Sequence, residues 1–305
     1  MAISFLDERP PRNNRLIPSD CAPDAMVYAD GIQALVAGLA SREPRSTAFY
    51  IHTSGAALIW DAPTGSANGR TWDDVDDIAD IVAQPHDASH AASDALVRSL
   101  TSSDPGKGPL AAIVAPSFVT GVSPSSQHPT PLVYPDWSYV LRRLGHPFIV
   151  GAGQNRMAFV DVRDLARLYS ALAGNALARL RDEAATEAAP DVAVWGPEAY
   201  YFGASIELSM RDFLEEHFVP ALRDGADFAI AGETREVPID RVVELVLERL
   251  GGAAGAELWS RHIAEAFGVN TRVRGTRAEK ALGFVWGQGD AGIAEAAALF
   301  LKRAG

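Results

Sequence analysis

Two histidines and an aspartate stand at a spacing that can serve chemistry. His86, His90 and Asp94 lie four residues apart in HDASHAASDALVRSL, and residues four apart share one face of a helix. Two imidazoles and a carboxylate there can ligate a metal or exchange protons with a substrate near neutral pH. A solvated polar helix face gives the same pattern. We expect a substrate-facing role or a plain surface, and we assign no metal site.

Several common catalytic motifs are missing from the sequence. A dinucleotide site needs a strand, a glycine-rich turn and a helix, because backbone N–H groups and the helix N-terminus bind the pyrophosphate. The segment GAGQNR, from Gly151, ends in Arg156 where a glycine is required and continues as a predicted strand, so we interpret it as a turn. There is also no GxSxG elbow, no Walker loop ending at Lys107, no HExxH at His262 and no CxxC.

An acidic cluster invites a metal-site interpretation, but a simpler one exists. Five aspartates occur between positions 73 and 80 (Asp73, Asp74, Asp76, Asp77 and Asp80). Carboxylates at the start of a helix are favoured by its dipole. We therefore predict that this cluster opens a helix and forms a solvated face.

The elements that must position these residues alternate between helix and strand. Residues 24–41 have helical apolar spacing, with Asp24 as the N-cap, and residues 47–53 form a short apolar strand that ends just before Ser54. A helix over 87–100 and a DPGKG turn lead into an apolar strand over 110–116. This alternation is typical of an α/β fold with a parallel sheet. The other predicted elements are helices at 131–145, 162–179, 209–222 (N-cap Ser209), 239–250, 257–267 and 276–282, strands at 147–150 and 199–203, and a loop at 185–190.

The composition and net charge limit the classes of binding partner that we expect. The chain has 305 residues, 48% of them hydrophobic, a formal charge of -12 and one cysteine, Cys21. The negative charge repels nucleic acid and anionic membranes. No apolar run is long enough for a membrane span and the N-terminus lacks a signal peptide pattern, so we expect a cytoplasmic protein that binds a small molecule, with no nucleic-acid and no membrane partner.

The order of segments from Tyr50 onward resembles the fungal branch of the extended short-chain dehydrogenase/reductase proteins, NAD-dependent epimerase/dehydratase-like or NAD(P)-binding. The resemblance covers Asp24–Gly305 and rests mainly on YIHTSG at Tyr50–Gly55, on Gly151–Asp164 and on RGTRAEKALGF at Arg274–Phe284. It implies a Rossmann-like, doubly wound parallel sheet with a smaller, mainly helical C-terminal portion on the substrate side. The implied division is an irregular segment at 1–23, a partial NAD(P)-binding domain at 24–185 and the C-terminal portion at 186–305.

The chain departs from that family in two ways. Members carry further residues ahead of the matched part that form the first strands and the glycine-rich loop. A βαβ unit needs about 30 residues, so Met1–Pro23 cannot supply them, and we expect an N-terminally truncated sheet. The family also uses a Tyr four residues before a Lys, but the residues four before Lys107, Lys280 and Lys302 are Ser, Thr and Ala.

The resemblance also suggests site residues. Ser54 matches the hydroxyl position of the family motif, and His90 and Asp94 lie where the Tyr–Lys pair usually occurs, so we predict these three as catalytic. The predicted substrate pocket adds five residues, namely Thr53, Ser117, Phe118, Asn155 and Arg156. We expect Ser54, His90 and Asp94 to face one cleft.

Three functions remain open at this point. The chain is an NAD(P)-dependent epimerase/dehydratase- or reductase-like protein with degenerate cofactor binding, a cofactor-independent isomerase, cyclase or lyase that uses Ser54 and His90, or a non-catalytic ligand-binding or interaction protein. We expect NAD(P), the family's cofactor, to bind weakly. We also expect the strand at 47–53 to lie at or near a sheet edge, which favours a homodimer or aggregation through that edge.

Overall fold

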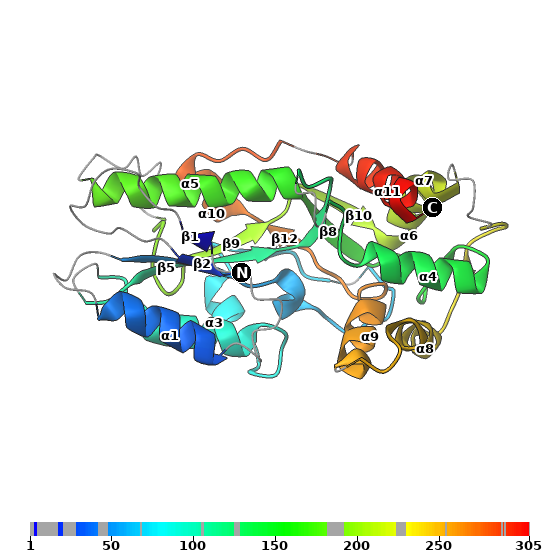
Figure 1. The fold of residues 1–305 in the computed structure, drawn as a ribbon, viewed down its shortest axis with the longest axis horizontal. Coiled ribbons are helices and arrows are strands. Elements are labelled where there is room, and N and C mark those ends of the chain that lie inside the picture. The colour runs from blue at the N-terminus through cyan, green and yellow to red at the C-terminus, as the bar shows by residue number, and fades with distance from the viewer. Residues whose placement is uncertain are drawn as a thin grey trace.

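The computed structural model describes residues 3–4, 18–20, 29–41, 48–67, 69–104, 107–124, 129–181, 192–223, 230–253, 255–287, 289 and 291–304. The fold has a layered α/β part and a mainly helical part beside it (Figure 1). Its strands are β1 (Ile3–Ser4), β2 (Pro18–Asp20), β3 (Phe49–Thr53), β4 (Trp72–Asp73), β5 (Leu110–Pro116), β6 (Phe118–Thr120), β7 (Phe148–Ile149), β8 (Arg156–Asp161), β9 (Tyr200–Gly203), β10 (Ile206–Ser209), β11 (Arg235–Glu236) and β12 (Val273–Arg274).

Helices surround these strands. They are α1 (Ala29–Ala40), α2 (Ile78–Val82), α3 (Ala91–Leu100), α4 (Tyr134–Leu144), α5 (Val162–Leu180), α6 (Met210–Asp212), α7 (Val219–Arg223), α8 (Ile239–Leu250), α9 (Ala256–Glu265), α10 (Thr276–Leu282) and α11 (Ala291–Ala304), with a 3₁₀ turn η1 (Ala56–Ile59) and a π-helical turn η2 (Phe213–Phe218) between α6 and α7.

In the described part of the chain, the main sheet has five strands in the order β1-β2-β3-β5-β9. Strands β2, β3, β5 and β9 run parallel, and β1 pairs antiparallel with β2. The predicted parallel sheet through Phe49–His52, Ala111–Val114 and Tyr200–Phe202 is confirmed, and Ser54 lies at the carboxyl end of β3 as expected. The Rossmann-like α/β class predicted from the sequence is therefore the observed fold.

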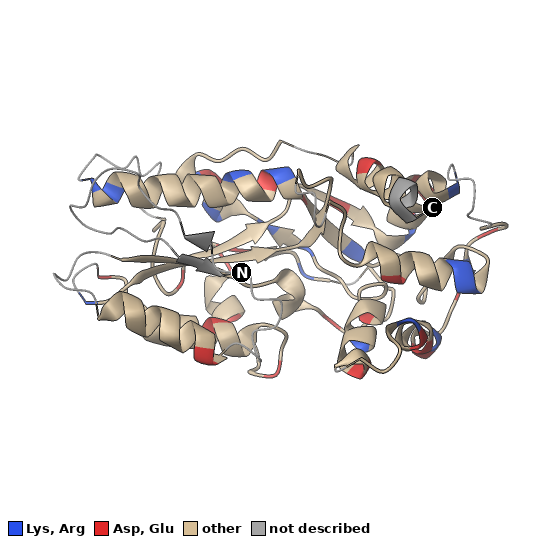
Figure 2. Cartoon of the chain, in the orientation of Figure 1, with Lys and Arg blue, Asp and Glu red and all other residues tan. Residues whose placement is uncertain are grey.

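Alternating side chains place helices on both faces of this sheet. Tyr50, Ala111 and Ile113 pack with α1 and α3, whereas Ile51 and Val114 pack with α5 on the other face. Parallel sheets covered on both faces need nearly continuous apolar strands, and β3, β5 and β9 carry no Lys, Arg, Asp or Glu (Figure 2). The apolar runs are thus explained by burial on both sides.

A second sheet leads the chain toward the helical part. Its order is β10-β8-β6, with β6 parallel and β10 antiparallel to β8. Ser117 is the single residue between β5 of the main sheet and β6 of this one. Beyond it, α4, α8, α9 and α11 enclose a second core around the fully buried Trp137.

Three expectations about the elements need correction. The helix predicted over 87–100 begins at Ala91, and His90 before it has a left-handed backbone. His86 therefore lies outside the helix, and the four-residue spacing does not put both histidines on one helical face. Strand β3 is not the edge of the sheet, because β2 pairs with it at Ser19 and Asp20. The segment 1–23, expected to be irregular, contributes β1 and β2.

Three further predictions are confirmed, and two others concern residues outside the described part of the chain. Helix α5 and strand β5 fall within one residue of their predicted bounds, and the Ser209 side chain accepts a hydrogen bond from the N–H of Asp212 as an N-cap should. The Asp24 cap and the 185–190 loop lie outside the described residues. Helix α11 was not predicted.

The acidic cluster is not a wholly solvated face, because one of its members, Asp74, is buried in the protein interior. This corrects the prediction from the sequence. Asp73 belongs to β4 and its Oδ1 accepts from the N–H of Val75, so the cluster forms a turn ahead of α2. Asp74 is fully buried and accepts from the N–H groups of Phe202 and Arg277. These bonds join the start of the cluster to β9 and α10.

None of the helices in the described part of the chain combines the length and apolar character that crossing a membrane requires.

Candidate functional site

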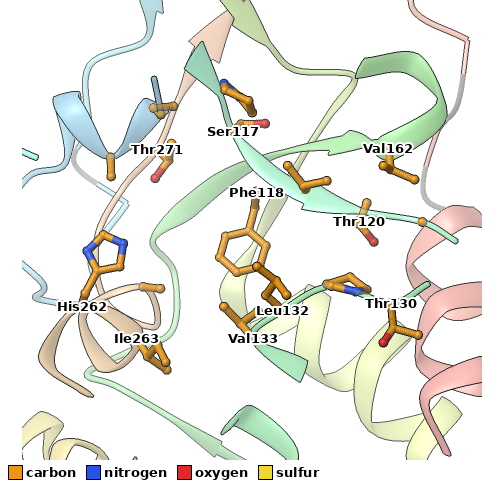
Figure 3. Close-up of a pocket in the computed structure, with 18 of the residues that line it drawn as sticks. Ser117, Phe118, Thr120, Thr130, Leu132, Val133, Val162, His262, Ile263 and Thr271 are labelled. Atoms are coloured by element: carbon orange, nitrogen blue, oxygen red, sulfur yellow. The ribbon is translucent and has the colours of Figure 1, made fainter. Parts of the chain in front are cut away.

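A cavity of about 520 Å³ opens where the strands of both sheets meet the helical part. Its walls come from the turn after β3 at Gly55, from Ser117 and Phe118, from the loop before α4 and from α9. Figure 3 shows Thr271 between Ser117 and His262 in this view, with Phe118 facing Leu132 and Val133. Open α/β sheets bind ligands outside the carboxyl ends of their strands, and this cavity lies at the carboxyl ends of β3 and β5.

Behind the Gly55 wall lies a buried polar network. The Ser54 hydroxyl donates to Asp94 Oδ2 at 2.7 Å, and His52 Nε2 lies 3.4 Å from Asp94 Oδ1. All three side chains are buried. Tyr200 lies beside the carboxylate, and burial together with the Asp94 charge raises the pKa of its phenol. Ser54 and Asp94 are thus bonded to each other, but neither side chain lines the cavity, so this cavity is not the one cleft that we expected them to share with His90.

His90 is the member of the predicted trio that reaches the cavity wall. Its φ of 66° is left-handed, a conformation that costs a non-glycine residue about 1 kcal/mol or more and often marks functional sites. The backbone carbonyl of His90 accepts from the N–H of Asp94 at 3.0 Å. A Cβ placed on Gly55 would lie 2.6 Å from His90 Nε2, so the ring packs directly on Gly55.

The predicted pocket residues divide into two groups. Ser117 and Phe118 line the cavity, as expected from their place after β5. Thr53, Asn155 and Arg156 do not line it. Thr53 Oγ1 is 2.5 Å from the Tyr169 hydroxyl, Asn155 is buried and donates to the Val269 carbonyl, and Arg156 pairs with Glu207. These three remain predictions for a substrate role, with structural contacts in this fold.

Sequence reasoning missed the aromatic end of the cavity. His262 stacks between Trp60, at 4.5 Å and 19° between rings, and Trp259, at 5.6 Å and 22°. All three line the cavity. The WSRH spacing does place Trp259 and His262 on one face of α9, but Trp60 comes from a distant segment that only the fold brings near. Thr271, also in the lining, follows α9 in an isolated bridge to Met157.

No cluster of three His, Cys, Asp or Glu side chains suited to a metal occurs in the part of the chain that the structure describes.

We predict that Gly55→Ala displaces the His90 ring, because the added methyl group and Nε2 cannot share the 2.6 Å between them. Any turnover or ligand affinity that depends on His90 should decrease in Gly55→Ala about as much as in His90→Ala. The turnover or affinity of the double variant should be no lower than that of His90→Ala, since both changes remove the same contact. Kinetics or binding of the four proteins measures this coupling, and additive losses would contradict it. Ala57→Gly, on the same wall, is the matched control.

No family of known proteins matches this chain by its sequence pattern, and no curated protein matches it. Solved structures do. The UDP-glucuronic acid 4-epimerase from Bacillus cereus, in complex with UDP-glucuronic acid and NAD, aligns with a TM-score of 0.52 at 12% identity, over 92% of this chain and 68% of that one. The UDP-glucose 4-epimerase from Thermotoga maritima aligns with a TM-score of 0.47 at 13% identity, over 84% of this chain and 64% of that one.

A dTDP-glucose 4,6-dehydratase from Streptomyces venezuelae, with NAD bound, aligns with a TM-score of 0.45 at 18% identity, over 84% of this chain. The chain spans 60% of the dehydratase and 64% of the Thermotoga epimerase, less than two thirds of either. The similarity is one of fold: this chain has the Rossmann-like α/β architecture of the Bacillus epimerase.

Proposed function

We propose that this chain is an epimerase/dehydratase- or reductase-like protein of the extended short-chain dehydrogenase type, acting on a small carbonyl or hydroxyl compound. The observation that carries the proposal is the cavity at the carboxyl ends of β3 and β5, closed by α9 from the C-terminal part. Such a position, between a parallel sheet and a substrate-side helical part, is where enzymes of this architecture bind ligands.

The described residues do not fit the dinucleotide that this fold implies. Among them, no glycine-rich turn joins a strand of the main sheet to a helix, so no row of backbone N–H groups faces a pyrophosphate. The parallel strands of the described residues also follow one another as β2-β3-β5-β9 without a reversal of order, whereas dinucleotides bind where the order reverses. We therefore derive no step through the nicotinamide, and weak NAD(P) binding remains our prediction.

Proton transfer is the chemistry that the chain's own side chains can supply. His90 reaches the cavity wall, and an imidazole can take a proton from a substrate and return it near neutral pH. The hydrogen-bonded Ser54 and Asp94 hold His90 in place from two sides. The Asp94 N–H donates to the His90 carbonyl, and Ser54 directly precedes Gly55, on which the His90 ring packs. We assign His90 as the proton-transferring group and Ser54 and Asp94 as positioning residues.

The same geometry favours a second candidate, a cofactor-independent isomerase or lyase. His90 at the wall supports it, since removal and return of a proton next to a carbonyl group need no nicotinamide. The two candidates differ in whether turnover requires NADH or NADPH.

Deuterium exchange tests both. The purified protein is incubated with small aldehydes and hydroxyketones in D₂O, with and without NADH or NADPH, and NMR follows deuterium entering the carbon next to the carbonyl. Absorbance of the reduced nicotinamide is followed in parallel. We expect exchange or turnover that His90→Ala abolishes and that His86→Ala, an exposed histidine outside the cavity, leaves unchanged.

Turnover that survives His90→Ala would overturn the assignment of the site. If the protein binds a ligand but changes no compound under any of these conditions, it is a ligand-binding protein, and the catalytic proposal is wrong.

A further inference from the structure

We infer that the cavity takes an uncharged ring compound bearing one hydroxyl or carbonyl group, and not a nucleotide sugar. The inference deepens the proposed function, because it names the substrate class of the same cavity. Three properties of the cavity carry it: its lack of charge, its aromatic wall and its two unpaired hydroxyl groups.

The described part of the cavity wall carries no charge of fixed sign. Among the described lining residues there is no Lys, Arg, Asp or Glu, and the titratable side chains are His90 and His262. Arg163, which follows the lining residue Val162, is held in ion pairs with Asp161 and Glu295. A diphosphate carries two negative charges, and burying it without cationic partners is costly. UDP-glucuronic acid, bound in the Bacillus epimerase, is such a ligand.

One end of the cavity presents flat aromatic surface. Trp60, His262 and Trp259 form a continuous stack, and Trp259 is 40% exposed, so part of its ring is open to a ligand. Phe118 also lines the cavity, and its ring stacks on the buried Trp137 at 4.7 Å. Rings pack well against such surfaces and gain beyond the area that they bury. The shape and chemistry of this end therefore favour a planar ring.

The third property is a pair of hydroxyl groups that have no hydrogen-bond partner among the described residues. Ser117 Oγ and Thr271 Oγ1 make no hydrogen bond to any described residue, although Ser117 is only 8% and Thr271 only 2% exposed. Both line the cavity (Figure 3). A buried hydroxyl without a partner is unfavourable, and a ligand oxygen inside the cavity would satisfy it. The ligand should thus carry a hydroxyl or carbonyl group toward Ser117 and Thr271.

Three probe compounds separate the effects of the hydroxyl group, the aromatic ring and ligand charge on binding. Isothermal titration measures binding of 2-naphthol, an uncharged ring with one hydroxyl, of naphthalene, the same ring without it, and of UDP-glucose. We expect 2-naphthol to bind about three- to tenfold more tightly than naphthalene, the ratio that one hydrogen bond supplies. UDP-glucose should not bind.

Variants then assign the binding to this cavity. In Ser117→Ala/Thr271→Val the preference for 2-naphthol should fall to about one, while naphthalene binds as before. Both changes remove unpartnered hydroxyls and should leave folding intact. Ser170→Ala, on an exposed turn of α5, is the control. Trp259→Ala should weaken the binding of both 2-naphthol and naphthalene. Leu258 is the neighbouring residue but does not line the cavity, so Leu258→Ala should leave the binding of both unchanged.

Each other outcome overturns the inference. Binding of UDP-glucose that His90→Ala weakens, without binding of 2-naphthol, would show a nucleotide-sugar site and leave the proposed function standing. Binding of 2-naphthol that none of the variants changes would place the site elsewhere. If no probe binds, the inference fails, and deuterium exchange decides the proposed function separately.

Discussion

Replacing Trp137 by alanine should lower the free energy of unfolding by about 3–5 kcal/mol, the range for removing a large buried aromatic side chain. Trp137 is fully buried, and its ring centroid lies 4.7 Å from Phe118, 4.9 Å from Phe267 and 5.5 Å from Phe213. It is therefore the central contact of the helical part's core. Chemical denaturation monitored by circular dichroism measures the change.

The same variant should weaken ligand binding, because Phe118 loses the ring that fixes it in the cavity wall. Trp137→Phe is the matched control. The Trp137 Nε1 has no hydrogen-bond partner among the described residues, so phenylalanine removes an unpaired donor along with some volume and should cost much less than alanine. If Trp137→Ala and Trp137→Phe lowered the free energy of unfolding equally, the packing of an aromatic ring at this position would not contribute to stability.

Replacing Asp74 by alanine should be similarly severe, at about 2–5 kcal/mol. Asp74 Oδ2 accepts from the Phe202 N–H at 2.9 Å and Oδ1 from the Arg277 N–H at 2.7 Å, all in the buried interior. Alanine leaves two buried backbone donors unpaired, at about 1–3 kcal/mol each. Asp74→Asn keeps one acceptor and should fall between alanine and the unchanged protein in the same denaturation experiment.

Asp74 should also make stability depend on pH. Burial raises the pKa of its carboxyl from 3.8 to about 8, against the lowering effect of the N–H donors and of Arg277. Because the folded state then binds this proton more tightly than the unfolded state, the contribution of Asp74 to stability is full below pH 4. That contribution is lost as the pH rises through about 8.

Denaturation across this pH range, compared with Asp74→Asn, isolates the effect. The difference between the two proteins should grow more favourable to asparagine as the pH rises. A difference independent of pH would mean that Asp74 is ionised throughout.

The sequence was most informative where burial enforces a pattern. The strands β3, β5 and β9 could be predicted because a sheet covered on both faces leaves only apolar residues in them. The start of the helix at Ala91 could not be predicted, since no local pattern encodes the left-handed backbone of His90 or the approach of its ring to Gly55. The buried role of Asp74 was hidden for a related reason, because its partners are on β9 and α10.

The site was predictable only in part. Ser117 and Phe118 could be named because they follow a central strand. The resemblance pointed to Ser54 and Asp94 but not to the hydrogen bond that joins them. The aromatic stack could not be predicted, because Trp60 and His262 meet only through the folding of α9 over the sheet. Arg156 was predicted in the substrate pocket, but it pairs with Glu207 on the adjacent strand and does not line the cavity.

The uncharged cavity has a consequence for the solution conditions under which the protein works. A site that binds an anion through basic side chains loses affinity as added salt screens the attraction. Here the chain carries a net charge of -12, whereas the described residues that line the cavity present no fixed charge to an uncharged ligand. Sodium chloride should leave affinity for such a ligand nearly unchanged, and sulfate, which strengthens apolar burial, should increase it. The protein would then bind its ligand equally well in dilute and in concentrated sodium chloride, and more tightly in sulfate.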